Sequence, residues 1–223
     1  MEKLKELLTN PFDGLTIDSF NDKCYDIAKS LFCNYYIDCN GKKYYFAEIE
    51  FYYWEKIEWN EKWNRVTYPR QCEAGELFFH LSGMDICFNS YYNENKLDEE
   101  AKFGGILIRA IRDENNNVIA GPWNCMLKIL NDSRGGNMPT IEFSQTPINT
   151  DDSIKPTYRA LGEIDKQEDE NNSLNLCFFD SKIDNWNHTK IRLKKESGKL
   201  EYYKSIYDTK RFKSAGISKG KRH

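Results

Sequence analysis

Two acidic side chains and a tyrosine alternate along one aromatic segment. Glu48, Glu50 and Tyr52 lie in the stretch 44–54, Tyr-Tyr-Phe-Ala-Glu-Ile-Glu-Phe-Tyr-Tyr-Trp, which is typical of a β-strand. Because strand side chains alternate, these three should share one face with Phe46. The opposite face is predicted to be a core face: Tyr45, Ala47, Ile49 and Phe51. A carboxylate among aromatic rings is poorly solvated, so its pKa should rise, which suits a general acid or base. The alternative is an ordinary solvent face.

An arginine interrupts a second, strongly apolar segment. Residues 104–111 read Gly-Gly-Ile-Leu-Ile-Arg-Ala-Ile, which predicts a buried strand around Arg109. A buried guanidinium must meet a carboxylate or a phosphate, because an unpaired charge is too costly there. Arg109 is therefore a candidate site residue, or else a structural partner of Glu48.

Further elements should position these two strands. A short helix is expected over 2–8, and apolar residues at helical spacing predict another over 20–32, capped by Asp18 or Ser19. The turn Asp38-Cys39-Asn40-Gly41 predicts a hairpin into the Glu50 strand. A helix is expected at 123–130, and strands at 76–81, 84–89, 174–180 and 190–194.

Residues 55–71 lack a clear period and contain Trp59, Trp63 and Tyr68. A segment of this length and composition is either a functional loop or a small subdomain. Its tryptophans either contact a ligand or pack back onto the body.

Composition limits the class of protein. With 223 residues, of which 39% are hydrophobic and 14% aromatic, the chain suits one large domain. No apolar run approaches ~18 residues, so no membrane span is expected.

Seven scattered cysteines without a Cys-x-x-Cys pair predict reduced thiols in a cytoplasmic protein. Three histidines, none at ligand spacing to a cysteine pair, make a zinc site improbable. We expect no metal and no cofactor.

The net charge is distributed unevenly along the chain. Residues 190–223 contain twelve Lys or Arg and three Asp or Glu, a net +9, so the overall −3 leaves −12 for residues 1–189. The basic C-terminal segment either reaches for phosphate or is a solvated, partly flexible tail.

Several motifs, in order, resemble those of the 3-methyladenine (alkyladenine) DNA glycosylase family. They are Ala28-Lys29-Ser30-Leu31 before a hairpin, Glu48-Ile49-Glu50-Phe51-Tyr52, Thr67-Tyr68-Pro69-Arg70-Gln71, Ala74-Gly75-Glu76-Leu77, Gly83-Met84-Asp85-Ile86-Cys87-Phe88-Asn89, Gly105-Ile106-Leu107-Ile108-Arg109-Ala110-Ile111 and Gly121-Pro122. Each motif is weak alone, but their order and spacing over roughly 25–131 are specific. Beyond that, only 159–162 and 174–180 are suggestive.

The resemblance implies a single α+β domain, here 1–189, around a curved antiparallel sheet with flanking helices. It implies a monomeric, monofunctional hydrolase that flips a modified base from double-stranded DNA and cuts its N-glycosidic bond with an activated water, in base excision repair or a related role. By position, Glu50 would activate the water and Arg109 would hold the site or a phosphate. The base would be bound by the remaining positions: Tyr52, Phe79 or His80, and Asn89.

Three departures from the family pattern matter. No histidine lies between 53 and 79, so Trp59 or Trp63 would replace the stacking histidine of the family. The position of the aromatic wedge falls at Ser82, which is too small to fill the gap left by a flipped base. The body is acidic where the family has a basic DNA-binding face. Two alternatives therefore stay open: a catalytically silent nucleic-acid or nucleoside binding module on the same fold, and a small-molecule nucleoside or sugar hydrolase using Glu48 and Glu50.

Overall fold

The longest helix begins with a reciprocal pair of side-chain contacts. In the computed structural model, α2 (Ile17–Asn34) starts at Thr16, whose Oγ1 accepts from the Ser19 N–H while the Ser19 Oγ accepts from the Thr16 N–H. This capping box satisfies two donors that a helix start otherwise leaves unpaired. The sequence prediction of Asp18 or Ser19 as the cap was wrong, although Ser19 is the reciprocal partner.

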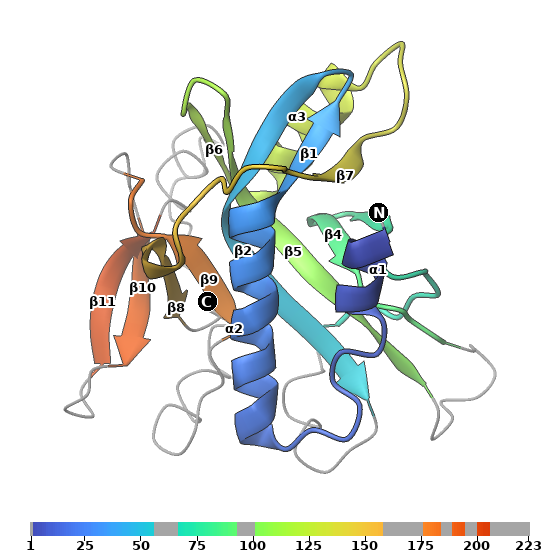
Figure 1. Cartoon of the computed structure of the whole chain (residues 1–223), viewed down its shortest axis with the longest axis vertical. Helices are drawn as coiled ribbons and strands as arrows, with labels where there is room; N and C mark the ends of the chain where they lie inside the picture. Colours follow the sequence, from blue (N-terminus) through green and yellow to red (C-terminus); the bar gives the residue numbers. More distant parts are fainter. Residues whose placement is uncertain are drawn as a thin grey trace, which may run out of the picture.

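The structure describes residues 2–55, 67–92, 101–157, 176–183, 189–194 and 200–205 (Figure 1). The helices are α1 (Glu2–Leu8), α2, α3 (Pro122–Asp132) and the short 3₁₀ turn η2 (Asp151–Ser153). The strands are β1 (Tyr35–Cys39), β2 (Lys42–Glu55), β3 (Leu77–His80), β4 (Gly83–Cys87), β5 (Lys102–Asp113), β6 (Val118–Ala120), β7 (Thr140–Phe143), β8 (Ile154–Thr157), β9 (Cys177–Asp180), β10 (Thr189–Lys194) and β11 (Leu200–Ser205).

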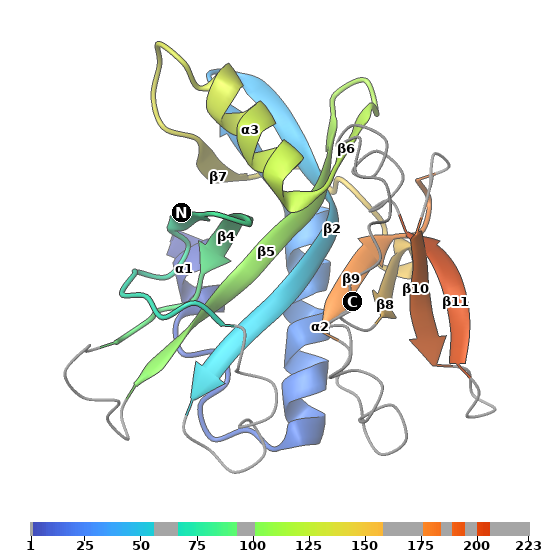
Figure 2. The same ribbon diagram turned by 180° about the vertical axis from the view of Figure 1, so that it is seen from behind.

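An antiparallel sheet organises the chain. Its strand order is β3-β4-β5-β2-β1-β7; β6 also pairs with β5, and β9 pairs with both β2 and β8. The long strands β2 and β5 run diagonally through the centre, and the sheet curves around them (Figures 1 and 2). The predicted fold class, a single α+β domain around a curved antiparallel sheet with flanking helices, is confirmed.

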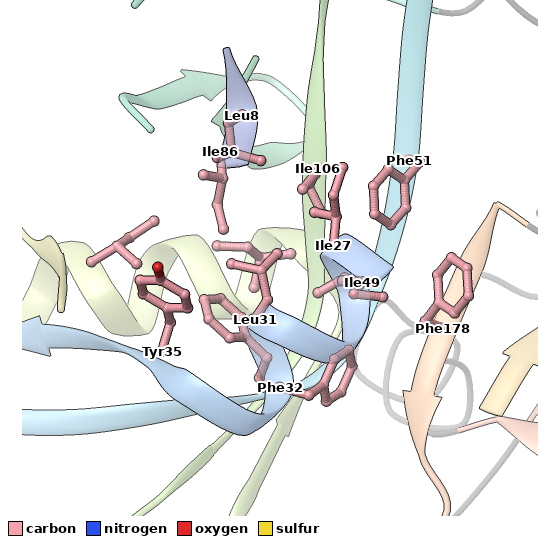
Figure 3. Packing of buried hydrophobic residues seen from close by; sticks show 14 of the residues in the cluster. Leu8, Ile27, Leu31, Phe32, Tyr35, Ile49, Phe51, Ile86, Ile106 and Phe178 are labelled. Carbon is pink, nitrogen blue, oxygen red and sulfur yellow. The ribbon is translucent and has the colours of Figure 1, made fainter. Parts of the chain in front are cut away.

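The main core lies between α2 and one face of this sheet. Ile27, Leu31 and Phe32 of α2 are fully buried and pack towards strand residues such as Ile49 and Phe51 (Figure 3). Burial of each large aliphatic or aromatic side chain contributes about 1.5–3 kcal/mol, which makes this layer the principal source of stability. α3 contacts β4, β5 and β6 (Figure 2), and its buried residues Cys125, Met126 and Ile129 belong to the same core.

The β1–β2 hairpin follows the sequence prediction, and a second hairpin joins β3 to β4. Asn40 and Gly41 join β1 to β2 with φ values of 54° and 86°, the left-handed conformations that a two-residue hairpin turn requires. Leu81 and Ser82 form the turn between β3 and β4, because His80 pairs with Gly83. The predicted strand over 76–81 therefore ends at His80, and the one predicted over 84–89 begins at Gly83 and ends at Cys87.

The basic segment contains more structure than expected. β10 and β11 form a separate two-stranded antiparallel sheet. The first of these strands was predicted, whereas the strand over Leu200–Ser205 was not. Residues 206–223 lie outside the described residues.

Candidate functional site

Arg109 stands at an irregularity between the two central strands. Ala110 pairs with Glu48 and Ile108 pairs with Ile49, so Arg109 is an extra residue with no opposite partner on β2. Such a β-bulge bends a strand locally and re-aims a side chain, which is why bulges are common beside functional sites. Here the bulge directs the guanidinium towards two carboxylates of β2.

A second bulge changes the alternation that the sequence predicted. Phe46 pairs with Ile111 and Glu48 with Ala110, which leaves Ala47 as the extra residue on β2. Phe46 consequently lies in the main core, whereas Ala47 belongs to a small separate cluster with Ala110. The predicted placement of Phe46 with the acidic side chains, and of Tyr45 and Ala47 in the main core, was wrong. Beyond the bulge the predicted alternation holds.

Glu50 accepts hydrogen bonds at both carboxylate oxygens. Arg109 Nη1 donates to Oε2, and the hydroxyl of Tyr52 donates to Oε1 at 3.0 Å. Glu50 is 1% exposed. An ion pair in such a place is strongly coupled, because little water screens it. Glu50, Tyr52 and Arg109, to which the motif resemblance assigns separate roles, are thus in contact in the structure.

Glu48 holds the other side of the same guanidinium. Its Oε1 lies 3.0 Å from Arg109 Nε and 3.6 Å from the Cys177 thiol, which donates to it. Its Oε2 has no hydrogen-bond partner within the described part of the chain. Burial raises the pKa of Glu48, and the neighbouring charge of Glu50 adds to this, while Arg109 opposes it. The rise in pKa expected for a carboxylate in this strand therefore applies to Glu48.

Two carboxyl groups share one cation, Arg109. Burial alone would lower the pKa of the Arg109 guanidinium, but Glu50 and Glu48 outweigh it and hold the pKa well above its ordinary value. Burial and the same carboxylates raise the pKa of the Cys177 thiol, which keeps this sulfur protonated and a donor. We call these residues the Glu50 cluster: Glu48, Glu50, Tyr52, Arg109 and Cys177.

A second charged group lies on the same face of the sheet. Glu50 pairs with Leu107, and Leu107 pairs with Asp85, so their side chains point to one side. Asp85 is buried, accepts from Arg70 Nη1 at 2.5 Å and lies 3.1 Å from His80 Nε2. A single leucine therefore separates the Glu50 cluster from a buried Arg70–Asp85–His80 group.

Arg70 and Asp85 are site residues that the sequence reasoning did not assign. The one local sign of their position is Gly105, because a Cβ added there would lie 2.9 Å from Arg70 Nη1 and 2.8 Å from the Ile86 carbonyl. The guanidinium thus lies directly over the glycine, which pairs with Tyr52 on the neighbouring strand. A glycine inside an apolar strand indicates such a close approach, but not which residue makes it.

The remaining predicted site residues are dispersed. Phe79 is partly buried against the main core, on the face opposite to Glu50, so it does not form a wall of the Glu50 cluster. His80 belongs to the Arg70–Asp85 group. Asn89 follows β4 with an exposed side chain, and its N–H donates to the Leu8 carbonyl. Trp59 and Trp63 lie outside the described residues.

Ser82 has a strongly exposed apolar neighbour. Leu81, the other residue of the β3–β4 turn, is 90% exposed. An apolar side chain is thus exposed at the tip of this turn.

The described residues contain neither a metal-binding cluster nor a helix that could cross a membrane. No set of three or more His, Cys, Asp or Glu side chains could hold a metal ion in the described ranges. Within those same ranges, no helix is both long enough and apolar enough to span a bilayer.

Comparison with known proteins gives one relative. No protein-family model and no solved structure matches the chain. The chain is similar to an uncharacterized protein of Acanthamoeba polyphaga mimivirus, with 31% identity over 145 residues, which is 56% of this chain and 62% of the relative. The chain thus spans less than two thirds of the length of that relative.

Proposed function

We propose that this chain is a monofunctional DNA glycosylase that hydrolyses the N-glycosidic bond of a modified base. The observation that carries the proposal is the position of Glu50 between Arg109 and Tyr52. This group unites three residues for which the motif resemblance implies catalytic or base-binding roles. The pairing of β2 with β5 and the bulge at Arg109 bring the three together, although 59 positions separate Glu50 from Arg109.

In this proposal four residues of the Glu50 cluster have separate tasks. Glu50 accepts a proton from the attacking water as the bond between base and sugar breaks. The Tyr52 hydroxyl yields its hydrogen bond on Glu50 to that water, while its ring stacks on the base. Arg109 keeps Glu50 oriented, and Glu48 holds Arg109 from the other side. The chemistry needs no metal or cofactor, and the DNA partner is a duplex with one flipped base.

The test is release of a base from duplex DNA carrying one of a panel of lesions. Glu50→Gln keeps the shape and one acceptor oxygen but removes the basicity, so we expect a rate loss of about 10²–10⁴-fold with DNA binding retained. Glu48→Gln should be milder. The matched control is Glu114→Gln in the exposed β5–β6 turn, which should behave like the parent. Equal rates for the parent and Glu50→Gln would refute the assignment, and a borohydride-trapped protein–DNA adduct would refute a monofunctional mechanism.

A catalytically silent binding module is the second candidate. The specific observation in its favour is that both Glu50 oxygens are already occupied and the side chain is 1% exposed. In that case Glu50 is a structural partner of Arg109. If the parent protein binds lesion DNA but releases none of the bases in the panel, this second function replaces the first.

A further inference from the structure

Four flat groups are stacked beside the β3–β4 hairpin. The guanidinium of Arg70 lies 4.3 Å from the centre of the Phe78 ring. The rings of Phe78 and His80 are 5.8 Å apart and 27° from parallel, and those of His80 and Tyr68 are 4.9 Å apart and tilted by 39°. Tyr68 is the outermost layer and is 45% exposed. The stack therefore runs from a buried cation to a phenol ring at the surface.

Hydrogen bonds fix three of the four stacked groups, all except the Phe78 ring. Arg70 Nε donates to the Tyr68 carbonyl at 3.0 Å, and Asp85 accepts from Arg70 and contacts His80. The Ser82 N–H donates to His80 Nδ1 at 3.2 Å, and the hydroxyls of Tyr68 and Ser82 are 3.3 Å apart. Because both the ring and its support are already ordered, a ligand that covers Tyr68 pays little additional conformational entropy.

We propose that Tyr68 is a stacking site for an unpaired base of single-stranded nucleic acid. A flat, supported and exposed ring binds planar aromatic groups, and stacking on such a side chain changes affinity about tenfold or more for each base. Phosphate is the poorer fit, because the nearest cation in the stack is buried and paired with Asp85. The site lies outside the Glu50 cluster and needs no reaction there.

The test uses binding of a lesion-free single-stranded DNA oligonucleotide, measured by fluorescence anisotropy. Tyr68→Ala should weaken binding about tenfold, whereas Tyr68→Trp, which keeps a large π face, should retain it. Tyr91→Ala is the matched control, since Tyr91 is 46% exposed but has no place in the stack. The dependence of affinity on salt should be the same for the parent and Tyr68→Ala, because no phosphate contact is lost.

A second measurement keeps the parent protein and changes the DNA. An oligonucleotide of the same length with abasic sites has the phosphates but lacks the bases, so the parent should bind it about tenfold more weakly. Equal affinity for the two oligonucleotides would overturn the proposal, as would equal effects of Tyr68→Ala and Tyr91→Ala. A change of oligomeric state in Tyr68→Ala would instead assign the ring to contact between copies of the chain. Binding of a lesion-free single strand requires no release of a base, so failure of the glycosylase proposal leaves this result unaffected.

Discussion

Glu48 and Glu50 lie two residues apart, yet their surroundings differ. Glu50 receives a donor on each oxygen, whereas Glu48 shares one oxygen between Arg109 and the Cys177 thiol and keeps the other unpaired within the described structure. The direction of the pKa shift of Glu48 reflects its complete burial. The pair therefore does not flank a substrate as two glycosidase carboxylates do, which weighs against a sugar hydrolase.

Removal of Arg109 should affect stability as well as activity. Arg109→Leu would leave Glu48 and Glu50 buried without a counter-charge, and breaking a buried ion pair in this way typically costs about 3–5 kcal/mol. Urea unfolding of Arg109→Leu and Arg109→Lys measures this, and the lysine variant should lose less. If Arg109→Leu unfolds at the same urea concentration as the parent, the buried ion pairs described here are not present in solution.

At the scale of elements, the sequence predicted most of the sheet but missed its bulges. Alternation placed Glu48, Glu50 and Tyr52 together because β2 is regular beyond Glu48. Alternation failed at Phe46 and Ala47, because one inserted residue moves the preceding side chains to the opposite face of the sheet. Such an insertion leaves no local sign in the sequence. The contact between Arg70 and Asp85 could not be predicted from the sequence either. It depends on the register between β4 and β5 and on the position of the Arg70 side chain over Gly105.

One acidic residue joins α3 to the β1–β2 hairpin. Asp132, at the end of α3, contacts Tyr44, Lys42 and Lys128. Partial burial by itself would raise the pKa of Asp132, but hydrogen bonds from these three side chains outweigh it and lower the pKa below its ordinary value. A lowered pKa means that this stabilisation is complete above the unfolded-state pKa, about 4, and is lost as pH falls through the folded-state pKa.

Asp132→Asn should therefore destabilise the protein by about 1–3 kcal/mol at neutral pH, where its charged hydrogen bonds are intact. The difference in unfolding free energy between parent and variant should shrink as the pH falls below about 4. Urea titrations across this range measure it, with Asp22→Asn on the exposed side of α2 as a control for charge. A difference that does not change with pH would contradict the role given to Asp132.

For the whole molecule, the distribution of charge predicts how salt affects nucleic-acid binding. Residues 206–223 contain six Lys or Arg and one Asp, a net +5. If they contact phosphate, deletion of 206–223 should reduce the slope of log affinity against log salt by up to about 5, without changing base choice. The cut follows the last residue of β11 and spares the described strands. An unchanged slope would exclude this segment from the phosphate contacts.

The position of β2 also determines how the Glu50 cluster can move. Glu48 to Glu50 pair with β5 on one edge and with β9 on the other, so this part of the backbone has no open edge. In deuterated water, the amide protons of 48–50 should exchange only through near-global unfolding, far more slowly than those of β3 at the edge of the sheet. Fast exchange at 48–50 would show that the ladder opens locally. With slow exchange, a substrate must reach Glu50 by side-chain rearrangement over a backbone that stays closed.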